Sequence, residues 1–158
     1  MRLLRSLAAL VPLALFSACL DNTSPPQIRV EDVVFAPSLN VDLATSTKTQ
    51  SGLYYKDLSL GTGTTFGAGT KASVYYLGYF SDGSPFDSVQ PGDSGAPFTF
   101  TIGDGSIIPG FDEGVRGMKV GGRRQLIIPP WLAYGSYAYG GIPGNSVLVF
   151  VVDAADAQ

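Results

Sequence analysis

The residue types that this chain lacks limit the chemistry that it could do. Histidine is absent and cysteine occurs once among 158 residues. Mechanisms that need an imidazole, including His-containing triads and His-ligated metals, are therefore excluded, as are cysteine-rich metal clusters. The chain instead offers nine Phe and eight Tyr. Such side chains can line an apolar pocket, but taken alone they indicate an ordinary hydrophobic core.

The charged residues add little chemistry of their own. The formal net charge is −3, so no surface is expected to neutralise the phosphates of a nucleic acid. Arg123 and Arg124 are too few for an anionic-lipid patch, and we expect the solvated start of a strand there. The segment Gly103-Asp104-Gly105 is predicted to be a turn. No P-loop lysine follows it, and the acidic spacing of an EF-hand is missing.

Short strands and one helix must position any site. Period-two alternation and runs of β-branched or aromatic residues predict strands over residues 53–58, 72–80, 98–102, 124–128 and 146–152. A helix is predicted over residues 109–118, because Phe111, Val115 and Met118 fall on one face. Glycines weaken this helix, so packing must hold it. One short helix among five strands predicts an α+β domain, with an antiparallel sheet wrapped over the helix.

The first residues have the layout of a secretory signal peptide. Arg2 and Arg5 precede an apolar stretch of about ten residues, too short for a membrane span of roughly 20 residues. The stretch ends in FSAC (16–19), which resembles a bacterial lipobox, although Leu is usual at its first position. The sequence predicts a signal peptide over residues 1–18 and lipidation of Cys19. The alternative is an ordinary secretory signal with an incidental cysteine.

The rest of the chain divides into a linker and a domain. Residues 19–50 are predicted to be a lipid-anchored, partly ordered linker, because an apolar segment lies between its polar ends. Residues 51–158 are predicted to be the folded domain. Leu20 follows the predicted lipid-bearing cysteine, which favours the outer membrane if the envelope is Gram-negative and of the enteric type. We expect a monomer anchored in the cell envelope, facing the periplasm or the exterior.

Five segments of the folded part occur in an order and at a spacing that resemble one known family. This family is the FKBP-type peptidyl-prolyl cis-trans isomerases, and the bacterial exported members in particular. The segments are GLYYKDLSLGTG (52–63), VYYLGYFSDGSPFDS (74–88), PFTFTIGDGSIIPGFDEGVRGMKVGGRRQLIIPP (97–130), LAYG (132–135) and GIPGNSVLVF (141–150). Each is a weak signal alone, but all five in order are specific. The resemblance implies a half-barrel of five to six antiparallel strands around one short helix.

The resemblance implies a site built from aromatic and aliphatic side chains with one acid. The residues to which it assigns catalytic roles are Tyr76, Asp87, Ile108 and Tyr134. Among these, the Ile108 backbone N–H and the Tyr134 hydroxyl would bind substrate carbonyls. The residues to which it assigns substrate-binding roles are Phe86, Phe98, Ile107, Phe111, Ile142 and Phe150.

The chain departs from the family pattern in ways that bear on this site. Phe111 stands where the family often has a tryptophan, which gives a smaller pocket floor without an indole N–H. The loop over residues 88–97 offers no arginine partner for Asp87. Residues 135–141 are expected to overhang the pocket. Their tyrosines either select the residue before proline or only cover the rim.

The implied function is acceleration of X–Pro bond rotation in exported polypeptides, by a non-covalent mechanism in a desolvated aromatic pocket. The resemblance implies no cofactor and no metal. The expected partners are proline-containing unfolded or loop segments, macrolide inhibitors, and the membrane through the N-terminal lipid, with no nucleic acid. Two alternatives stay open. One is a catalytically weak polypeptide-binding or chaperone module on the cell envelope. The other is a structural lipoprotein with a vestigial domain.

Overall fold

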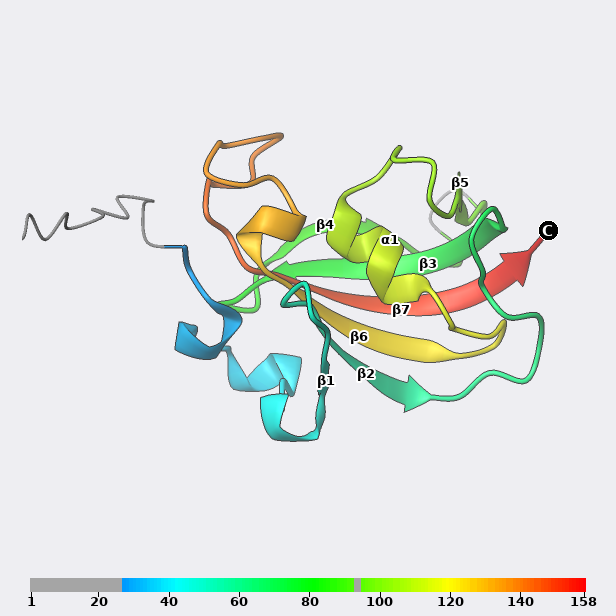
Figure 1. Ribbon diagram of the computed structural model, residues 1–158, viewed down its shortest axis with the longest axis horizontal. Helices are drawn as coiled ribbons and strands as arrows, with labels where there is room; N and C mark the ends of the chain where they lie inside the picture. Colours follow the sequence, from blue (N-terminus) through cyan, green and yellow to red (C-terminus); the bar gives the residue numbers. More distant parts are fainter. Residues whose placement is uncertain (1–26, 93–94) are drawn as a thin grey trace, which may run out of the picture.

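A single antiparallel sheet forms the centre of the molecule. The computed structural model describes residues 27–92 and 95–158 (Figure 1). The strands are β1 (Thr47–Lys48), β2 (Tyr54–Ser59), β3 (Lys71–Phe80), β4 (Pro85–Val89), β5 (Phe98–Thr101), β6 (Arg123–Ile128) and β7 (Leu148–Ala157). Their order is β1-β2-β6-β7-β3-β4, and β5 also pairs with β3. The expected α+β class is confirmed. The sheet has seven strands, more than the expected five to six, because β1 and β4 add to the five that periodicity predicts.

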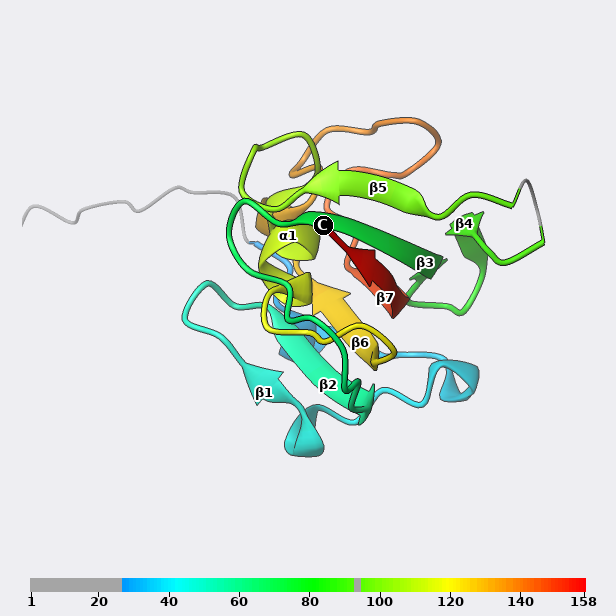
Figure 2. The same ribbon diagram turned by 90° about the vertical axis from the view of Figure 1, so that its right-hand side faces the viewer.

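The helix α1 (Pro109–Val115) crosses one face of the sheet (Figure 2). Pro109 opens the helix, where its missing N–H is not needed. Gly114 lies so close to the sheet that a Cβ there would be 2.7 Å from the Leu126 methyl groups. Gly110 makes a similar approach to Ile128. The glycines that weaken the helix on its own therefore allow its backbone to pack directly on β6.

The main core fills the space between α1 and the sheet. Its fully buried members include Phe66, Ile102, Val115 and Leu126. The side chains of Phe100, Leu148 and Val152 also belong to it, as the sequence predicts.

The other face of the sheet is covered by residues 27–46, which we call the strap. The strap contains three short 3₁₀ helices, η1 (Val30–Asp32), η2 (Pro37–Leu39) and η3 (Leu43–Thr45). Val30 and Leu39 are buried in a second cluster with Ile127 and Val149. Residues one position away on the same strands belong to the main core. Because successive side chains of a strand point to opposite faces, the two clusters lie on opposite sides of the sheet.

Polar contacts fix the strap in place. The Gln125 side chain on β6 donates to the Leu39 carbonyl at 2.8 Å. Tyr54 on β2 donates its hydroxyl to Glu31 at 2.7 Å, and Lys48 forms an ion pair with the same carboxylate. The strap is thus packed and hydrogen-bonded to the sheet that it covers.

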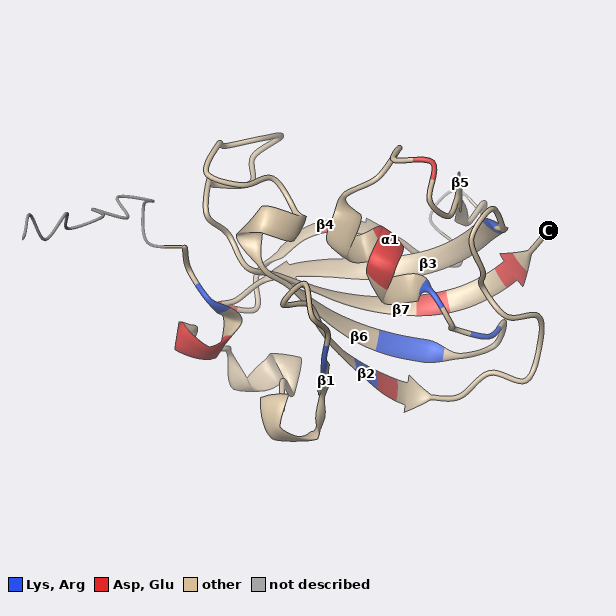
Figure 3. Cartoon of the chain, in the orientation of Figure 1, with Lys and Arg blue, Asp and Glu red and all other residues tan. Residues whose placement is uncertain are grey.

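Arg124 corrects the expectation of a solvated strand start. Its side chain is 7% exposed and donates to both carboxylate oxygens of Asp57, at 2.7 and 3.1 Å. The two residues are paired across β6 and β2. Figure 3 shows a blue segment of β6 beside a red segment of β2. Arg124 also donates to the carbonyls of Gly114 and Arg116 at the end of α1. Helix ends leave carbonyls without partners, so this buried cation joins the helix to the sheet. Arg123 is exposed and pairs with Asp153.

The predicted signal peptide and Cys19 lie outside the described residues. Within residues 27–92 and 95–158, the structure contains no helix long and apolar enough to span a membrane.

Candidate active site

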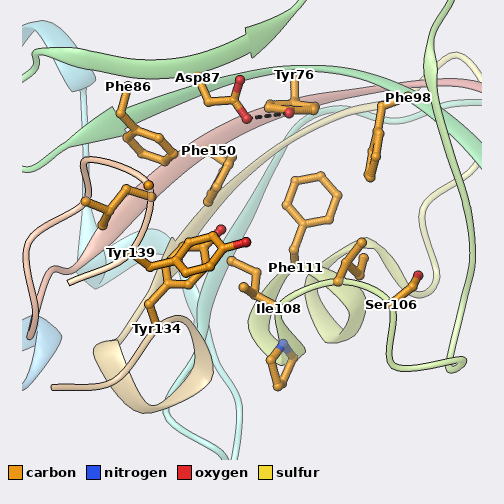
Figure 4. Close-up of a pocket in the computed structure, with 14 residues that line it drawn as sticks. Tyr76, Phe86, Asp87, Phe98, Ser106, Ile108, Phe111, Tyr134, Tyr139 and Phe150 are labelled. Atoms are coloured by element: carbon orange, nitrogen blue, oxygen red, sulfur yellow. Dashed lines mark hydrogen bonds between the residues drawn. The ribbon is translucent and has the colours of Figure 1, made fainter. Parts of the chain in front are cut away.

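A pocket of about 730 Å³ opens on the α1 side of the sheet (Figure 4). All ten predicted site residues line it: Tyr76, Phe86, Asp87, Phe98, Ile107, Ile108, Phe111, Tyr134, Ile142 and Phe150. The lining also includes Ser106, Pro109, Tyr139 and Gly140. Ser106 and Pro109 flank the predicted Ile107-Ile108 pair, so their presence follows from the same segment. The fold therefore brings together in one place residues that are up to 74 positions apart, from Tyr76 to Phe150.

The pocket walls come from different elements. Tyr76 lies on β3, Phe98 on β5 and Phe150 on β7. The side chains of Phe86 and Asp87 come from β4, which the periodicity does not predict. At Gly78 on β3 a Cβ would be 2.7 Å from the Phe86 ring. A larger residue there would push Phe86 out of the wall.

Phe111 forms the floor of the pocket. It is 4% exposed, and its ring meets those of Tyr76, Phe100 and Phe150 at centroid distances of 5.7, 5.9 and 5.2 Å. All three contacts are edge-to-face, the arrangement that aromatic quadrupoles favour. The floor is therefore apolar and fixed from several sides.

Tyr76 and Asp87 form the polar pair of the pocket wall. The Tyr76 hydroxyl donates to Oδ2 of Asp87 at 2.6 Å. Burial, followed by this hydrogen bond, raises the pKa of Tyr76 above its ordinary value. The phenol therefore stays protonated at neutral pH and acts as a donor. The carboxylate is held in a fixed orientation at the edge of the pocket.

Two further donors face the pocket from its opposite side. Ile108 caps α1, and its carbonyl accepts the N–H groups of Phe111 and Asp112. Its own N–H has no hydrogen-bond partner among the described residues. The Tyr134 hydroxyl likewise makes no hydrogen bond to any described residue. An amide N–H and a phenol are thus available to carbonyl groups of a ligand.

The rim loop, residues 133–147, forms the mouth of the pocket. Tyr139 stacks on Tyr134 with ring centroids 4.9 Å apart and planes 11° apart. Burial raises the pKa of Tyr134, with smaller contributions from Tyr139 and Asp87. The Asn145 N–H donates to the Gly135 carbonyl at 2.7 Å and closes the loop. Residues 135–141 contain two tyrosines. Tyr139 lines the pocket, whereas Tyr137 is 81% exposed and does not line it.

In the part of the chain that the structure describes, no three His, Cys, Asp or Glu side chains are grouped to hold a metal ion.

Comparisons with known proteins relate the chain to one family. The family model for FKBP-type peptidyl-prolyl cis-trans isomerases matches residues 63–154. The chain is 47% identical over 114 residues to FK506-binding protein 4 of Mycosarcoma maydis, which covers 72% of the chain and 30% of the relative. It is 46% identical to FK506-binding protein 4 of Chaetomium thermophilum, covering 72% and 22%. The chain therefore spans less than a third of the length of these curated relatives.

Solved structures give the same result. FkpA from Escherichia coli is 38% identical with a TM-score of 0.65, covering 72% of this chain and 52% of that one. AtFKBP13 is 34% identical, also with a TM-score of 0.65, covering 72% and 98%. With a family model over more than half of the sequence and a solved relative covered almost completely, this chain belongs to the FKBP-type peptidyl-prolyl cis-trans isomerase family.

Proposed function

We propose that this protein catalyses rotation about X–Pro peptide bonds in its pocket. The observation that carries the proposal is an apolar aromatic cup with two donors at one side, the Ile108 N–H and the Tyr134 hydroxyl, that make no hydrogen bond to any described residue. A proline ring fits an apolar cup, and the donors suit the carbonyl groups beside it. Family membership supports the same activity.

The physical reason is the nature of the barrier. Rotation costs about 18–20 kcal/mol because it breaks amide resonance, and the uncatalysed reaction takes tens to hundreds of seconds. The twisted amide has lost conjugation and much of its dipole. A water-poor site with fixed donors therefore binds the twisted amide better than the planar one. Each 1.4 kcal/mol of that preference gives about tenfold in rate.

Asp87 has an orienting and electrostatic role in this mechanism. Its carboxylate holds the Tyr76 hydroxyl and lies at the edge of the cup. No proton needs to move during the rotation, so general-base catalysis is not required. Substitution of Asp87 by Ala should lower kcat/KM by freeing Tyr76 and removing the charge.

The direct test is isomerisation of a short X–Pro peptide by the purified protein, with and without a rapamycin-like macrolide. We expect catalysis that the macrolide blocks and that Asp87→Ala or Tyr134→Phe weakens. A folded protein that binds the peptide without turnover would contradict the proposal and favour a polypeptide-binding module. A protein that binds neither peptide nor macrolide would favour a vestigial domain.

We further propose that the protein is an exported lipoprotein of the cell envelope, whose substrates are proline-containing segments of other exported proteins. The arginine-led apolar start, the FSAC segment over residues 16–19 and the single cysteine support this location. Residues 1–18 would be removed and Cys19 would carry the lipid. Replacing Cys19 with Ser should release the protein from membranes. Continued membrane association of that variant would contradict the lipid anchor.

A further inference from the structure

One side chain carries the whole formal charge of the pocket lining. Of the fourteen lining residues, Asp87 is the only Asp, Glu, Lys or Arg. It is exposed, and its Oδ2 accepts the Tyr76 hydroxyl. Among the described residues, no lysine or arginine forms an ion pair with it. The carboxylate therefore faces the pocket without a neutralising cation.

The surroundings of the pocket do not compensate for this charge. Residues 125–152, which include the whole rim loop, contain no Asp, Glu, Lys or Arg. Figure 3 shows the rim loop as an uncoloured stretch, with the charges on other elements. Asp104 adds a second negative charge on the loop beside Ser106, whose N–H it accepts at 2.8 Å. The cation of Arg116 is paired with Asp112. Around the pocket mouth, the described charges are thus negative.

The field of Asp87 reaches across the pocket. Burial, then Tyr139 and then the negative charge of Asp87 raise the pKa of Tyr134. Tyr134 stands on the far wall in Figure 4. A substrate bound between these two side chains is therefore within the same field.

We propose that Asp87 makes this pocket favour X–Pro segments that carry a lysine or arginine next to the proline over those that carry an aspartate or glutamate there. The proposal rests on the isomerase function proposed above and specifies its substrate class. The neutral rim leaves no opposing charge to cancel the effect. Because the Asp87 carboxylate is exposed at the edge of the cup, its charge acts through water-like surroundings. At a separation of about 7 Å, one unit charge then changes binding by roughly threefold. Exchanging a positive for a negative neighbour then changes it by roughly tenfold.

The experiment compares two peptide series with purified protein. One series has Lys, Gln or Glu immediately before the proline, and the other has the same residues immediately after it. At low ionic strength we expect kcat/KM for Lys to exceed that for Glu by roughly tenfold in at least one series, with Gln between them. The difference should lie mainly in KM, because the charge acts on binding. It should shrink as salt is added, because exposed charges are screened.

A matched pair of variants assigns the effect to one carboxylate. Asp87→Asn keeps the shape and an acceptor for Tyr76, and should bring the Lys-to-Glu ratio close to one. Asp156→Asn removes the same charge near the end of β7, outside the pocket lining. That variant should leave the ratio unchanged, so it controls for the overall charge of the protein.

The outcomes separate this proposal from the one on which it rests. Equal kcat/KM for Lys and Glu in both series overturns the selectivity, as does a ratio that persists in Asp87→Asn or falls equally in Asp156→Asn. If no peptide is turned over, the isomerase function fails, and the same peptides are compared by their Kd in calorimetry. A Lys preference in Kd that Asp87→Asn abolishes still supports the charge selection, and equal Kd values overturn it.

Discussion

The two faces of the sheet are closed in different ways. On the α1 side, edge-to-face aromatic rings surround an open pocket, with Phe111 at its floor. On the other side, the aliphatic side chains of Val30 and Leu39 fill the space against the sheet. Adjacent residues serve both faces, since Phe150 lines the pocket and Val149 packs in the strap cluster. Substitutions in the pocket lining should therefore change catalysis, whereas those under the strap should change stability alone.

The largest effect is expected at the pocket floor. Phe111→Ala removes a ring that three others contact, and should lower the free energy of unfolding by about 3–5 kcal/mol. It should also lower kcat/KM more than tenfold, because the cup loses its base. Urea unfolding and peptide isomerisation measure the two effects.

A matched control lies in the same core but outside the pocket lining. Phe66 is 1% exposed, so Phe66→Ala should cost a similar free energy of unfolding. At a temperature where both variants are folded, its kcat/KM should stay near that of the unmodified protein. An equal loss of kcat/KM in both variants would show that the pocket floor has no special role.

The strap face should show the opposite pattern. Leu39→Ala should lower the free energy of unfolding by about 2–3 kcal/mol, at the lower end of the range for buried leucines because the site is at the domain edge. Its kcat/KM should not change. Val34 is 91% exposed in the same segment, so Val34→Ala should have almost no effect on stability. A catalytic loss in Leu39→Ala would mean that the two faces are coupled through the sheet.

The contrast between the faces also explains what the sequence could predict. Every predicted pocket residue lines the pocket, because the segments that carry them keep a fixed order and spacing. The strap has no such pattern, since 3₁₀ helices of three residues show no periodicity. A signal existed in β7, whose unbroken apolar run around Val149 requires burial on both faces. That run predicts a second layer, but not which segment supplies it.

The surroundings of Arg124 and the strand β4 are two further features that the sequence alone does not predict. The sequence shows a charge at a strand start, and solvent is the usual surroundings of such a charge. Only the tertiary structure brings Asp57 and the carbonyls at the end of α1 to Arg124. The strand β4 is five residues long and mostly exposed, so alternation of apolar residues is too weak to reveal it.

A smaller effect is expected at the polar pair of the pocket wall. Tyr76→Phe removes the hydroxyl that orients Asp87, and should lower kcat/KM by about fivefold to tenfold, equivalent to roughly 1–1.4 kcal/mol. Tyr75 is the adjacent residue on β3, with its side chain on the other face of the strand. Tyr75→Phe loses only a long contact to Gly95 at 3.4 Å and should keep full activity. Equal losses in both variants would contradict the orienting role.

The smallest effect is expected at the ion cluster of the strap. Hydrogen bonds from Lys48 and then Tyr54 lower the pKa of Glu31 to about 2. Because this folded-state pKa lies below the unfolded value of about 4.5, the stabilisation is full above that value and is lost as the pH falls toward 2. The Glu31 side chain is 31% exposed, so solvent screening limits the contribution to at most about 1 kcal/mol.

The measurement that isolates this effect is a difference between two proteins. Urea unfolding of the unmodified chain and of Glu31→Gln at pH 7 should differ by up to about 1 kcal/mol, and the difference should shrink as the pH falls from about 4.5 through about 2. Other carboxylates titrate in both proteins and cancel. Added salt should reduce the difference at pH 7, because the cluster is partly exposed. Since Glu31 acts on the strap face, kcat/KM at pH 7 should be the same for both proteins. A stability difference that grows as the pH falls would have the wrong sign for a carboxylate with a lowered pKa. It would show that the ion cluster does not stabilise the strap.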